Sequence, residues 1–345
     1  MIQGTTKTEA HYRAIIMDSS SSLKEFSTNR RKYHKRYILN EKVEEEDSKA
    51  SVMGRLVETL LMEEHLFDKK FHMSIVTNAP TALMLDFVEA LYKHTLAATD
   101  ENGAISRTFE EIAIDAHKDS GFKIKLDAVL AKFIGSDAEV YYKEIREVRS
   151  KGLTVVTTDD VTQANRIVET LKTNDATAPI VNLVESDRFN IYNQLQIEGY
   201  TVLGHTFKSM MDKVVIDHKE KTIQVYDLKC TWSVENFYEE YYLYRRSYIQ
   251  AYLYFEGAKQ SFADLTDYTV LYPKFIVCDS TNYMRPLIYE MTDTSMDHAF
   301  SGFTHRGREY PGVKKIIKDL QWAIKNDTWD VSRENSIANS VVKIN

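Results

Sequence analysis

The stretch that most constrains this chain covers residues 207–231, FKSMMDKVVIDHKEKTIQVYDLKCT, where apolar and polar residues alternate with period two. This alternation predicts one strand through Val214 and Ile216 and a second through Ile223 and Val225, joined by a polar turn of four residues. A hairpin closed by that turn pairs Ile216 with Ile223 and Val214 with Val225 on one face of a sheet.

The same register brings two carboxylates, Asp212 and Asp227, opposite each other at the end of that face, with their β-carbons about 5 Å apart. Opposed carboxylates repel, so either one is protonated or a cation lies between them, and hard oxygen ligands suit Mg²⁺ or Mn²⁺. Lys229 follows two residues after Asp227, so its ammonium projects from the same face. An Asp-x-Lys at a strand end is common and often has no function, but the opposed Asp212 favours a catalytic role.

Composition restricts the class of protein. The length of 345 residues and a hydrophobic fraction of 43% predict a soluble globular protein of one elaborate domain or two. No apolar run is long enough to span a membrane and no signal peptide is visible, so we expect a cytoplasmic protein without membrane partners. The two cysteines, Cys230 and Cys278, exclude a disulfide framework or a four-cysteine metal site within one chain.

Charge and motifs narrow the chemistry further. A net charge of −7 argues against a protein that coats nucleic acid, but it permits a DNA enzyme whose basic residues line one channel. The sequence contains no HExxH, Gly-rich phosphate loop or nucleophile elbow, which disfavours hydrolysis through a covalent nucleophile.

The N-terminal part combines helix-capping and basic residues. Asp18 and the serines at 19–22 are N-cap candidates for a helix that begins near Leu23, and residues 29–37 carry five cations and two tyrosines. The basic stretch suits phosphate contacts, although a solvated helix face would have the same composition. The candidate DNA contacts are Arg30, Arg31, Lys35 and Arg36, together with Lys208, Arg245 and Arg246 further along the chain.

Two helical regions follow an acidic segment at 41–49 that we expect to be a loop. The first, at about 49–66, has a buried apolar stripe with Glu58 on its border. The second covers residues 80–174 and has no catalytic constellation, so its histidines at 94 and 117 are expected to be surface or packing residues.

The C-terminal part is predicted to complete the sheet. A strand at 188–199 is expected beside the hairpin, where Glu198 either supports the site or is an ordinary acid near a turn. Spacing places Arg246, Gln250 and Tyr254 on one face of a helix. Further strands are predicted at 268–278 and 285–291, then one closing helix at 295–327 whose basic residues are additional DNA-contact candidates, Arg306, Arg308, Lys314, Lys315 and Lys318.

Several of these residues occur in a spacing that resembles a known nuclease family. Asp212 followed about fifteen residues later by Asp227-Leu-Lys229 resembles the core of PD-(D/E)XK nucleases. Gly54 four residues before Glu58, and Gln250 four residues before Tyr254, resemble the RecB-like branch. Additional matching segments make most of the chain similar to the phage-type exonuclease VIII (RecE) nuclease domain and to lambda exonuclease: the SSSLKEF stretch, Phe67-Asp68, Lys208 to Asp212, and Trp329-Asp. Cys230 stands where the family often has Thr, and Met211 where it often has Pro.

The resemblance implies an α/β fold, with a restriction-endonuclease-like central mixed β-sheet flanked by helices and a helical insertion. It implies one nuclease domain over residues 1–330, with a helical N-terminal and insert region at about 20–175, a catalytic core at about 186–295, the closing helix and a tail at 331–345. The implied activity is Mg²⁺-dependent digestion of one strand of linear duplex DNA, 5′ to 3′, by metal-assisted phosphodiester hydrolysis.

The resemblance also implies roles for individual residues. Glu58, Asp212, Asp227 and the carbonyl of Leu228 would hold one or two Mg²⁺ or Mn²⁺ ions, which lower the pKa of a bound water and neutralise developing charge. Lys229 would orient or deprotonate that water, and Gln250 and Tyr254 would position the substrate and active-site groups.

The implied partners are double-stranded DNA ends and a single-strand annealing recombinase, and the implied assembly is a ring-like homo-oligomer. Two alternatives remain open from the residues alone. An endonuclease would use the same carboxylates and lysine on circular DNA. A catalytically silent DNA-binding protein is the other, and the intact Asp212, Asp227 and Lys229 count against it.

Overall fold

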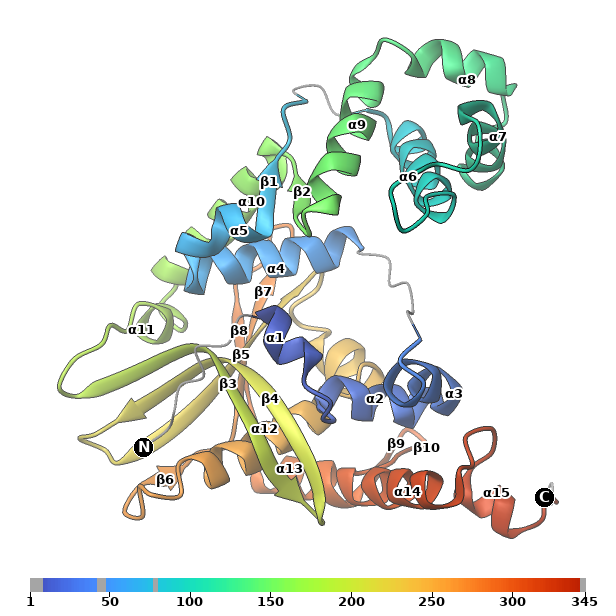
Figure 1. Cartoon of the computed structure of the whole chain (residues 1–345). Helices are drawn as coiled ribbons and strands as arrows, with labels where there is room; N and C mark the ends of the chain where they lie inside the picture. The colour runs from blue at the N-terminus through green and yellow to red at the C-terminus, as the bar shows by residue number, and fades with distance from the viewer. Residues whose placement is uncertain (1–8, 42–47, 77–79, 342–345) are drawn as a thin grey trace. The chain divides into compact units, whose positions relative to one another are not determined.

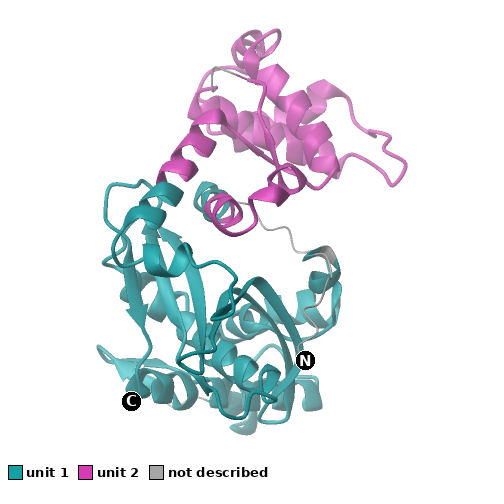
Figure 2. Ribbon diagram, turned by 90° about the vertical axis from the view of Figure 1, so that its left-hand side faces the viewer, with its two compact units in different colours: residues 1–54, 167–345 teal, residues 55–166 magenta. Residues whose placement is uncertain are grey.

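The structure, a computed structural model, describes residues 9–41, 48–76 and 80–341, so most of the predicted acidic loop lies outside the described residues. The chain forms two compact units, one from residues 1–54 and 167–345 and one from residues 55–166 (Figure 2). Each unit has its own buried core. The predicted helical insertion is therefore a unit in its own right, whereas the helices between residues 20 and 41 belong to the unit that contains the sheet.

A mixed sheet forms the centre of the larger unit, with strand order β3-β4-β5-β7-β8 and β6 beside the start of β5 (Figure 1). The β5–β7 and β5–β6 pairs are parallel, and the other pairs are antiparallel. The strands are β3 (Phe189–Val202), β4 (His205–Asp217), β5 (Thr222–Thr231), β6 (Thr269–Val270), β7 (Lys274–Asp279) and β8 (Leu287–Glu290).

The predicted hairpin is confirmed as β4 and β5. Val214 pairs with Val225 and Ile216 with Ile223, as the alternation predicts, and these side chains are buried. β3 lies beside β4, as predicted, and its register shifts between Glu198 and Tyr200, next to a Gly at φ +82°. The polar turn leaves Asp217 at its edge, where Arg188 Nη2 donates to the carboxylate at 2.7 Å.

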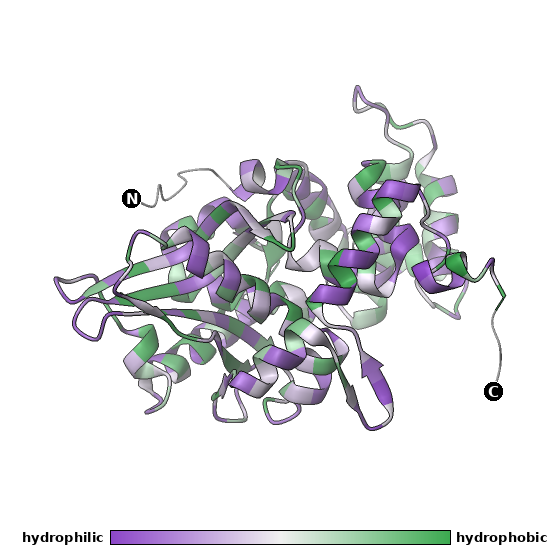
Figure 3. Ribbon diagram, turned by 90° about the horizontal axis from the view of Figure 1, so that it is seen from below, coloured by the Kyte–Doolittle hydropathy of each residue, from purple (hydrophilic) through white to green (hydrophobic). Residues whose placement is uncertain are grey.

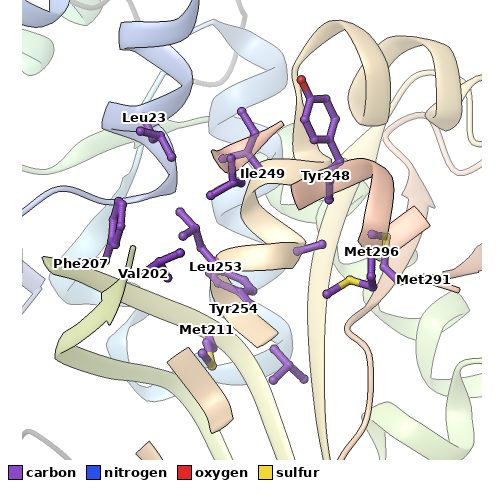
Figure 4. Close-up of a cluster of buried hydrophobic side chains, with 14 of the residues drawn as sticks. Leu23, Val202, Phe207, Met211, Tyr248, Ile249, Leu253, Tyr254, Met291 and Met296 are labelled. Atoms are coloured by element: carbon purple, nitrogen blue, oxygen red, sulfur yellow. The ribbon is translucent and has the colours of Figure 1, made fainter. Parts of the chain in front are cut away.

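Helix α12 (Ser247–Ser261) packs on the β3, β4 and β5 side of the sheet. Figure 4 shows Ile249, Leu253 and Tyr254 of α12 gathered with Leu23, which lies on α2 (Ser20–Thr28), and with Met211 of β4. These side chains belong to one buried cluster. The core therefore joins α2, α12 and the β4–β5 hairpin, although they are far apart in the sequence.

The remaining elements of this unit precede the sheet in the sequence, follow it, or lie between its strands. Along the last long helix, Val313, Ile316, Ile317 and Leu320 are buried at helical spacing. Figure 3 shows hydrophilic and hydrophobic residues alternating along the helical ribbons. The elements are α1 (Glu9–Ala14), α3 (Arg30–Tyr33), π-helix η1 (His34–Ile38), α11 (Ala178–Val181), π-helix η3 (Tyr238–Tyr244), α13 (Asp293–Ser301), β9 (Phe303–His305), β10 (Arg308–Tyr310), α14 (Val313–Asn326) and α15 (Arg333–Ile337).

The helical unit folds around α6 (Ala82–Ala97), α7, α8 and α9, in accord with the prediction for residues 80–174. Sequence reasoning missed β1 and β2, two short strands that pair in parallel. The other elements are α4 (Lys49–Met62) and α10 (Thr158–Thr173), both of which cross the unit boundary, and η2 (Glu64–Leu66), α5 (Phe67–Lys70), β1 (Phe71–Met73), α7 (Phe109–Asp119), α8 (Leu126–Phe133), α9 (Asp137–Ser150) and β2 (Thr154–Val156).

The predicted fold class, α/β with a central mixed sheet flanked by helices and a helical insertion, is confirmed. Among the described residues, no helix combines the length and apolar character that a membrane span requires.

The prediction of one closing helix over 295–327 is wrong. α13 ends before Gly302, whose φ of +91° is unfavourable for other residues, and the β9–β10 hairpin interrupts the helical run. Pro311 then lacks the N–H that a continuing helix would need, and α14 begins only after Gly312.

The predicted helix through Arg246 is also interrupted. π-helix η3 ends at Tyr244, and Arg246 has a left-handed backbone, with φ 54° and ψ 42°, before α12 begins at Ser247. Gln250 and Tyr254 share α12 as predicted, but Arg246 precedes the helix.

Replacing Gly312 with Ala is expected to destabilise the protein by about 3 kcal/mol or more, because overpacked backbone must shift. A β-carbon at this position would lie 2.3 Å from both the Phe300 carbonyl oxygen and the Gly302 nitrogen. Gly307→Ala is the matched control: it has open space and only an unfavourable φ of +76°, which costs about 1 kcal/mol. Chemical denaturation of both variants measures the difference, and equal losses would contradict the packing argument.

Candidate active site

The site forms where β5 leaves β4. The antiparallel ladder ends at Lys213 opposite Tyr226, and from Tyr226 onward β5 pairs with β7 instead. The predicted third pair, Asp212 with Asp227, is therefore not part of the ladder. In place of that backbone pair, the Asp212 carboxylate connects the two strands, because the Leu228 N–H donates to Asp212 Oδ2 at 2.8 Å. The two carboxylates are thus held on neighbouring strands by a side-chain bond.

Asp227 is the most buried acid of the site, with 1% of its surface exposed, and Asp212 is 9% exposed. Gln250 Nε2 donates to Asp227 Oδ1 at 2.7 Å. Asp227 Oδ2 forms an ion pair with the Lys229 ammonium, but it accepts no hydrogen bond of good geometry from any residue that the structure describes. The predicted convergence of Asp227 and Lys229 is observed.

Helix α12 supplies the groups behind Asp227. Gln250 Nε2 also approaches the Tyr254 hydroxyl at 2.8 Å, and that hydroxyl donates to the Met210 carbonyl at 2.6 Å. Burial raises the pKa of Tyr254 well above its ordinary value, and the negative charges of Asp227 and Asp212 raise it further. Tyr254 is therefore a neutral hydrogen-bonding group that ties α12 to β4.

Sequence reasoning did not single out Lys24 for the site. This residue lies on α2, and its Nζ donates to Gln250 Oε1 at 3.0 Å. Burial lowers the pKa of Lys24 to about 7, the positive charges of Lys229 and Arg245 lower it, and the charge of Asp227 opposes that shift. Lys24 lies in the SSSLKEF stretch that carries part of the resemblance, but the stretch gave it no role, and the contact with Gln250 reveals its place.

Glu58 belongs to the helical unit, and its predicted part in the site stays a prediction. It lies on α4 one turn after Gly54. Gly54 itself belongs to the sheet unit, where a β-carbon in its place would lie 3.8 Å from the β-carbon of Cys230. That distance is an ordinary van der Waals contact, so α4 packs beside the residue that follows Lys229 without a steric requirement for glycine at position 54.

The residues of the sheet unit fit a hard divalent cation. Asp227 Oδ2 is a buried carboxylate oxygen whose partner among the described residues is the Lys229 ammonium. Asp212 Oδ2 accepts the N–H of Leu228, the residue that follows Asp227. Two neighbouring carboxylates favour a cation between them, and oxygen donors suit Mg²⁺ or Mn²⁺. Over residues 9–41, 48–76 and 80–341, no group of three or more His, Cys, Asp or Glu side chains is placed to hold a metal ion.

The predicted DNA-contact residues have different environments. Arg31, Lys35 and Arg245 are exposed, and Arg245 lies over the Tyr241 ring at 4.4 Å. Arg30 and Arg31 line a cleft of about 310 Å³ between α2, α3 and residues 329–332. Arg36 lies 3.6 Å from the Glu25 carboxylate.

Two of the predicted contacts have structural roles instead. Lys208 is buried, and its ammonium donates to the carbonyls of residues 12, 13 and 15, which occupies its three N–H groups. Arg246 donates to the Ser27 carbonyl at 2.9 Å at the end of α2, and burial lowers its pKa. Both cations hold the N-terminal segment on the sheet unit, so the prediction that Lys208 contacts phosphate is corrected by its burial.

Lys208 and Arg31 are expected to separate these two roles. Lys208→Met should cost about 1–3 kcal/mol of stability by leaving buried carbonyls without a donor, while DNA affinity stays unchanged. Arg31→Met should leave stability unchanged and reduce the salt slope of DNA binding by about 1. Thermal melting and binding titrations at several salt concentrations measure both effects, and a loss of DNA affinity in folded Lys208→Met would contradict this assignment.

Other residues considered from sequence lie outside the site. His94 bonds Asp119 at 2.8 Å, and His117 bonds the Ile124 carbonyl at 2.7 Å, so both are local packing contacts as expected. Glu198 lies on β3 opposite Lys208, and its influence on the site stays a prediction.

No protein-family model matches the chain, and no curated protein matches it. One similar solved structure is described as a "Putative exonuclease" from Eubacterium rectale, with 14% sequence identity over 99% of this chain and 96% of that chain. Its TM-score is 0.48, which is too low to support an argument about fold or function.

Proposed function

We propose that this chain is a metal-dependent DNA nuclease that hydrolyses phosphodiester bonds. The observation that carries the proposal is the environment of Asp227. This buried carboxylate accepts a hydrogen bond from Gln250 and forms an ion pair with Lys229. The next residue, Leu228, donates its N–H to the second acid, Asp212. Structural ion pairs also occur in proteins, but two neighbouring acids, one of them deeply buried, and a lysine at the point where two strands separate favour a catalytic centre.

The chain's own residues would divide the work as follows. Asp212, Asp227 and the carbonyl of Leu228 would hold a divalent cation, which when bound would supply charge neutralisation and lower the pKa of a water. Lys229 would orient that water or accept its proton. Gln250 would fix the Asp227 carboxylate, and Tyr254 would fix Gln250.

Finer features of the proposal come from the resemblance of the sequence. They are a preference for the ends of linear duplex DNA, 5′ to 3′ polarity, one or two Mg²⁺ or Mn²⁺ ions with Glu58 as a further ligand, a ring-like homo-oligomer and a single-strand annealing partner in the cytoplasm. The carboxylates Asp212 and Asp227 and the ion pair at Lys229 would serve an endonuclease equally well.

The test is digestion of linear duplex DNA labelled at its 5′ or 3′ end, beside a closed circle of the same sequence, with Mg²⁺. Asp227→Asn is the inactive control, and Asp217→Asn, an acid bonded to Arg188 at the hairpin turn, is the matched active control. Loss of label from one end with the circle intact supports the exonuclease and gives its polarity. Cleavage of the circle supports the endonuclease, and binding without cleavage by the wild type overturns catalysis.

A further inference from the structure

We propose that Lys24 is a positioning residue that acts through Gln250. Its ammonium binds the oxygen of the Gln250 amide and so acts together with Asp227 and Tyr254, which accept from the amide nitrogen, to keep an N–H donor on the Asp227 carboxylate. The inference rests on the proposed function and adds a residue from the N-terminal helix to the site.

The direction of the hydrogen bonds carries the inference. Lys24 Nζ donates to the oxygen of the amide at 3.0 Å, and in its charged form it has three donors and no acceptor, so it cannot bind the amide nitrogen. The nitrogen of the same amide must then point to the other side, where Asp227 Oδ1 lies at 2.7 Å. If the amide were reversed, its N–H would face the Lys24 ammonium and its oxygen would face the Asp227 carboxylate, and both contacts would be repulsive.

This orientation matters for Asp227. With Oδ1 bonded to Gln250, the carboxylate presents Oδ2 toward Lys229 and a cation. An amide oxygen in the same place would repel Asp227 and turn it away from that geometry. Groups that orient a ligand typically change metal affinity or activity by about 10- to 100-fold when they are removed.

The surroundings hold Lys24 firmly in place. Ser19 and Ser22 form a capping box at the start of α2, and Leu23 beside Lys24 is fully buried. Asp18, just before the cap, accepts hydrogen bonds from Ser22 and Tyr33. At the other end of α2, the Ser27 carbonyl accepts the bond from Arg246 described above.

The cost of holding a charged Lys24 side chain in a buried position also supports a functional role. Burial and the nearby positive charges lower the pKa of Lys24, so its ammonium is held where a neutral side chain would be easier to accommodate. Sites that tolerate such a cost are frequently functional. Packing alone would be served by an apolar residue at this position.

A double-mutant cycle tests the inference with Lys24→Met, Gln250→Ala and the combined variant. The readouts are Mn²⁺ binding by calorimetry without DNA, and the single-turnover cleavage rate at saturating Mg²⁺ and DNA. We expect each single variant to lose about 10- to 100-fold in rate and to bind Mn²⁺ more weakly, and the double variant to be no worse than Gln250→Ala. Lys24→Arg, which keeps a charged donor, should recover part of the loss.

Lys221→Met is the matched control, because this lysine lies at the hairpin turn and pairs with Asp267. It should change neither readout. Melting temperatures are measured throughout, and Lys24→Gln replaces Lys24→Met if the latter is unfolded.

If the fold losses in cleavage rate of the two single variants multiply in the double variant, the inference is overturned, because Lys24 would then act independently of Gln250. A Lys24→Met protein that loses DNA affinity alone, with its rate restored at saturating DNA, would overturn it too and assign Lys24 to phosphate contact. A wild type that neither binds Mn²⁺ nor cleaves DNA overturns the proposed function instead, so the two failures are distinguishable.

Discussion

Asp227→Asn is expected to lower the DNA cleavage rate by on the order of 10³-fold or more, because it removes a charged oxygen ligand at the point where the transition state develops charge. Asn has nearly the same shape as Asp, and its oxygen can still accept the N–H of Gln250, which lies 2.7 Å from Asp227 Oδ1. The loss should therefore arise from charge and not from misfolding. Single-turnover cleavage of labelled linear duplex measures it.

A second readout for the same variant does not depend on catalysis. A cation that binds only the folded protein stabilises it by about 2.7 kcal/mol when present at 100 times its dissociation constant. Mn²⁺ should therefore raise the melting temperature of the wild type and of Asp217→Asn, but not that of Asp227→Asn. Equal Mn²⁺ stabilisation of all three proteins, or an Asp227→Asn rate within tenfold of the wild type, would remove Asp227 from the metal site.

The hairpin and its acids are predictable because local alternation determines them. Burial of Val214, Ile216, Ile223 and Val225 selects one register, and a shift by one residue would expose all four. The end of the ladder could not be predicted in the same way. β5 changes partner from β4 to β7 at Tyr226, and that exchange depends on a strand about fifty residues later.

The breaks in the helices divide into predictable and unpredictable ones. Gly302, Gly307 and Pro311 are visible signals within 295–327, and they explain why a hairpin interrupts the expected helix. Arg246 carries no such signal, since few residues other than Gly adopt a positive φ readily. Its bond to the Ser27 carbonyl is one contact that accompanies this conformation, and it joins residues more than two hundred positions apart.

Lys24 could not be assigned from sequence for the same reason. Its partner Gln250 lies 226 positions away, and a Lys in a capping helix has no distinctive spacing. Glu58 differs from Lys24, because its spacing from Gly54 on α4 predicts a role in the site although Glu58 belongs to the other unit.

Lys229→Gln is expected to reduce the cleavage rate by about 10²- to 10⁴-fold, the usual contribution of a group that moves or orients a proton. Its effect on metal binding should differ from that of Asp227→Asn, which lowers the affinity. The Lys229 ammonium forms an ion pair with Asp227 Oδ2, the oxygen that a cation would use. Removing the ammonium leaves both carboxylates charged and removes a competitor, so Mn²⁺ affinity should stay the same or rise.

Calorimetry with Mn²⁺ and single-turnover cleavage measure both effects of Lys229→Gln on the same preparation. Lys221→Gln is the control, because Lys221 pairs with Asp267 at the hairpin turn and should affect neither quantity. A rate loss accompanied by a loss of Mn²⁺ binding as large as that of Asp227→Asn would show that Lys229 holds the carboxylate in place. A rate loss with metal binding retained would assign Lys229 to the reacting water, because the variant would then bind the cation and the DNA but lack the group that handles the proton.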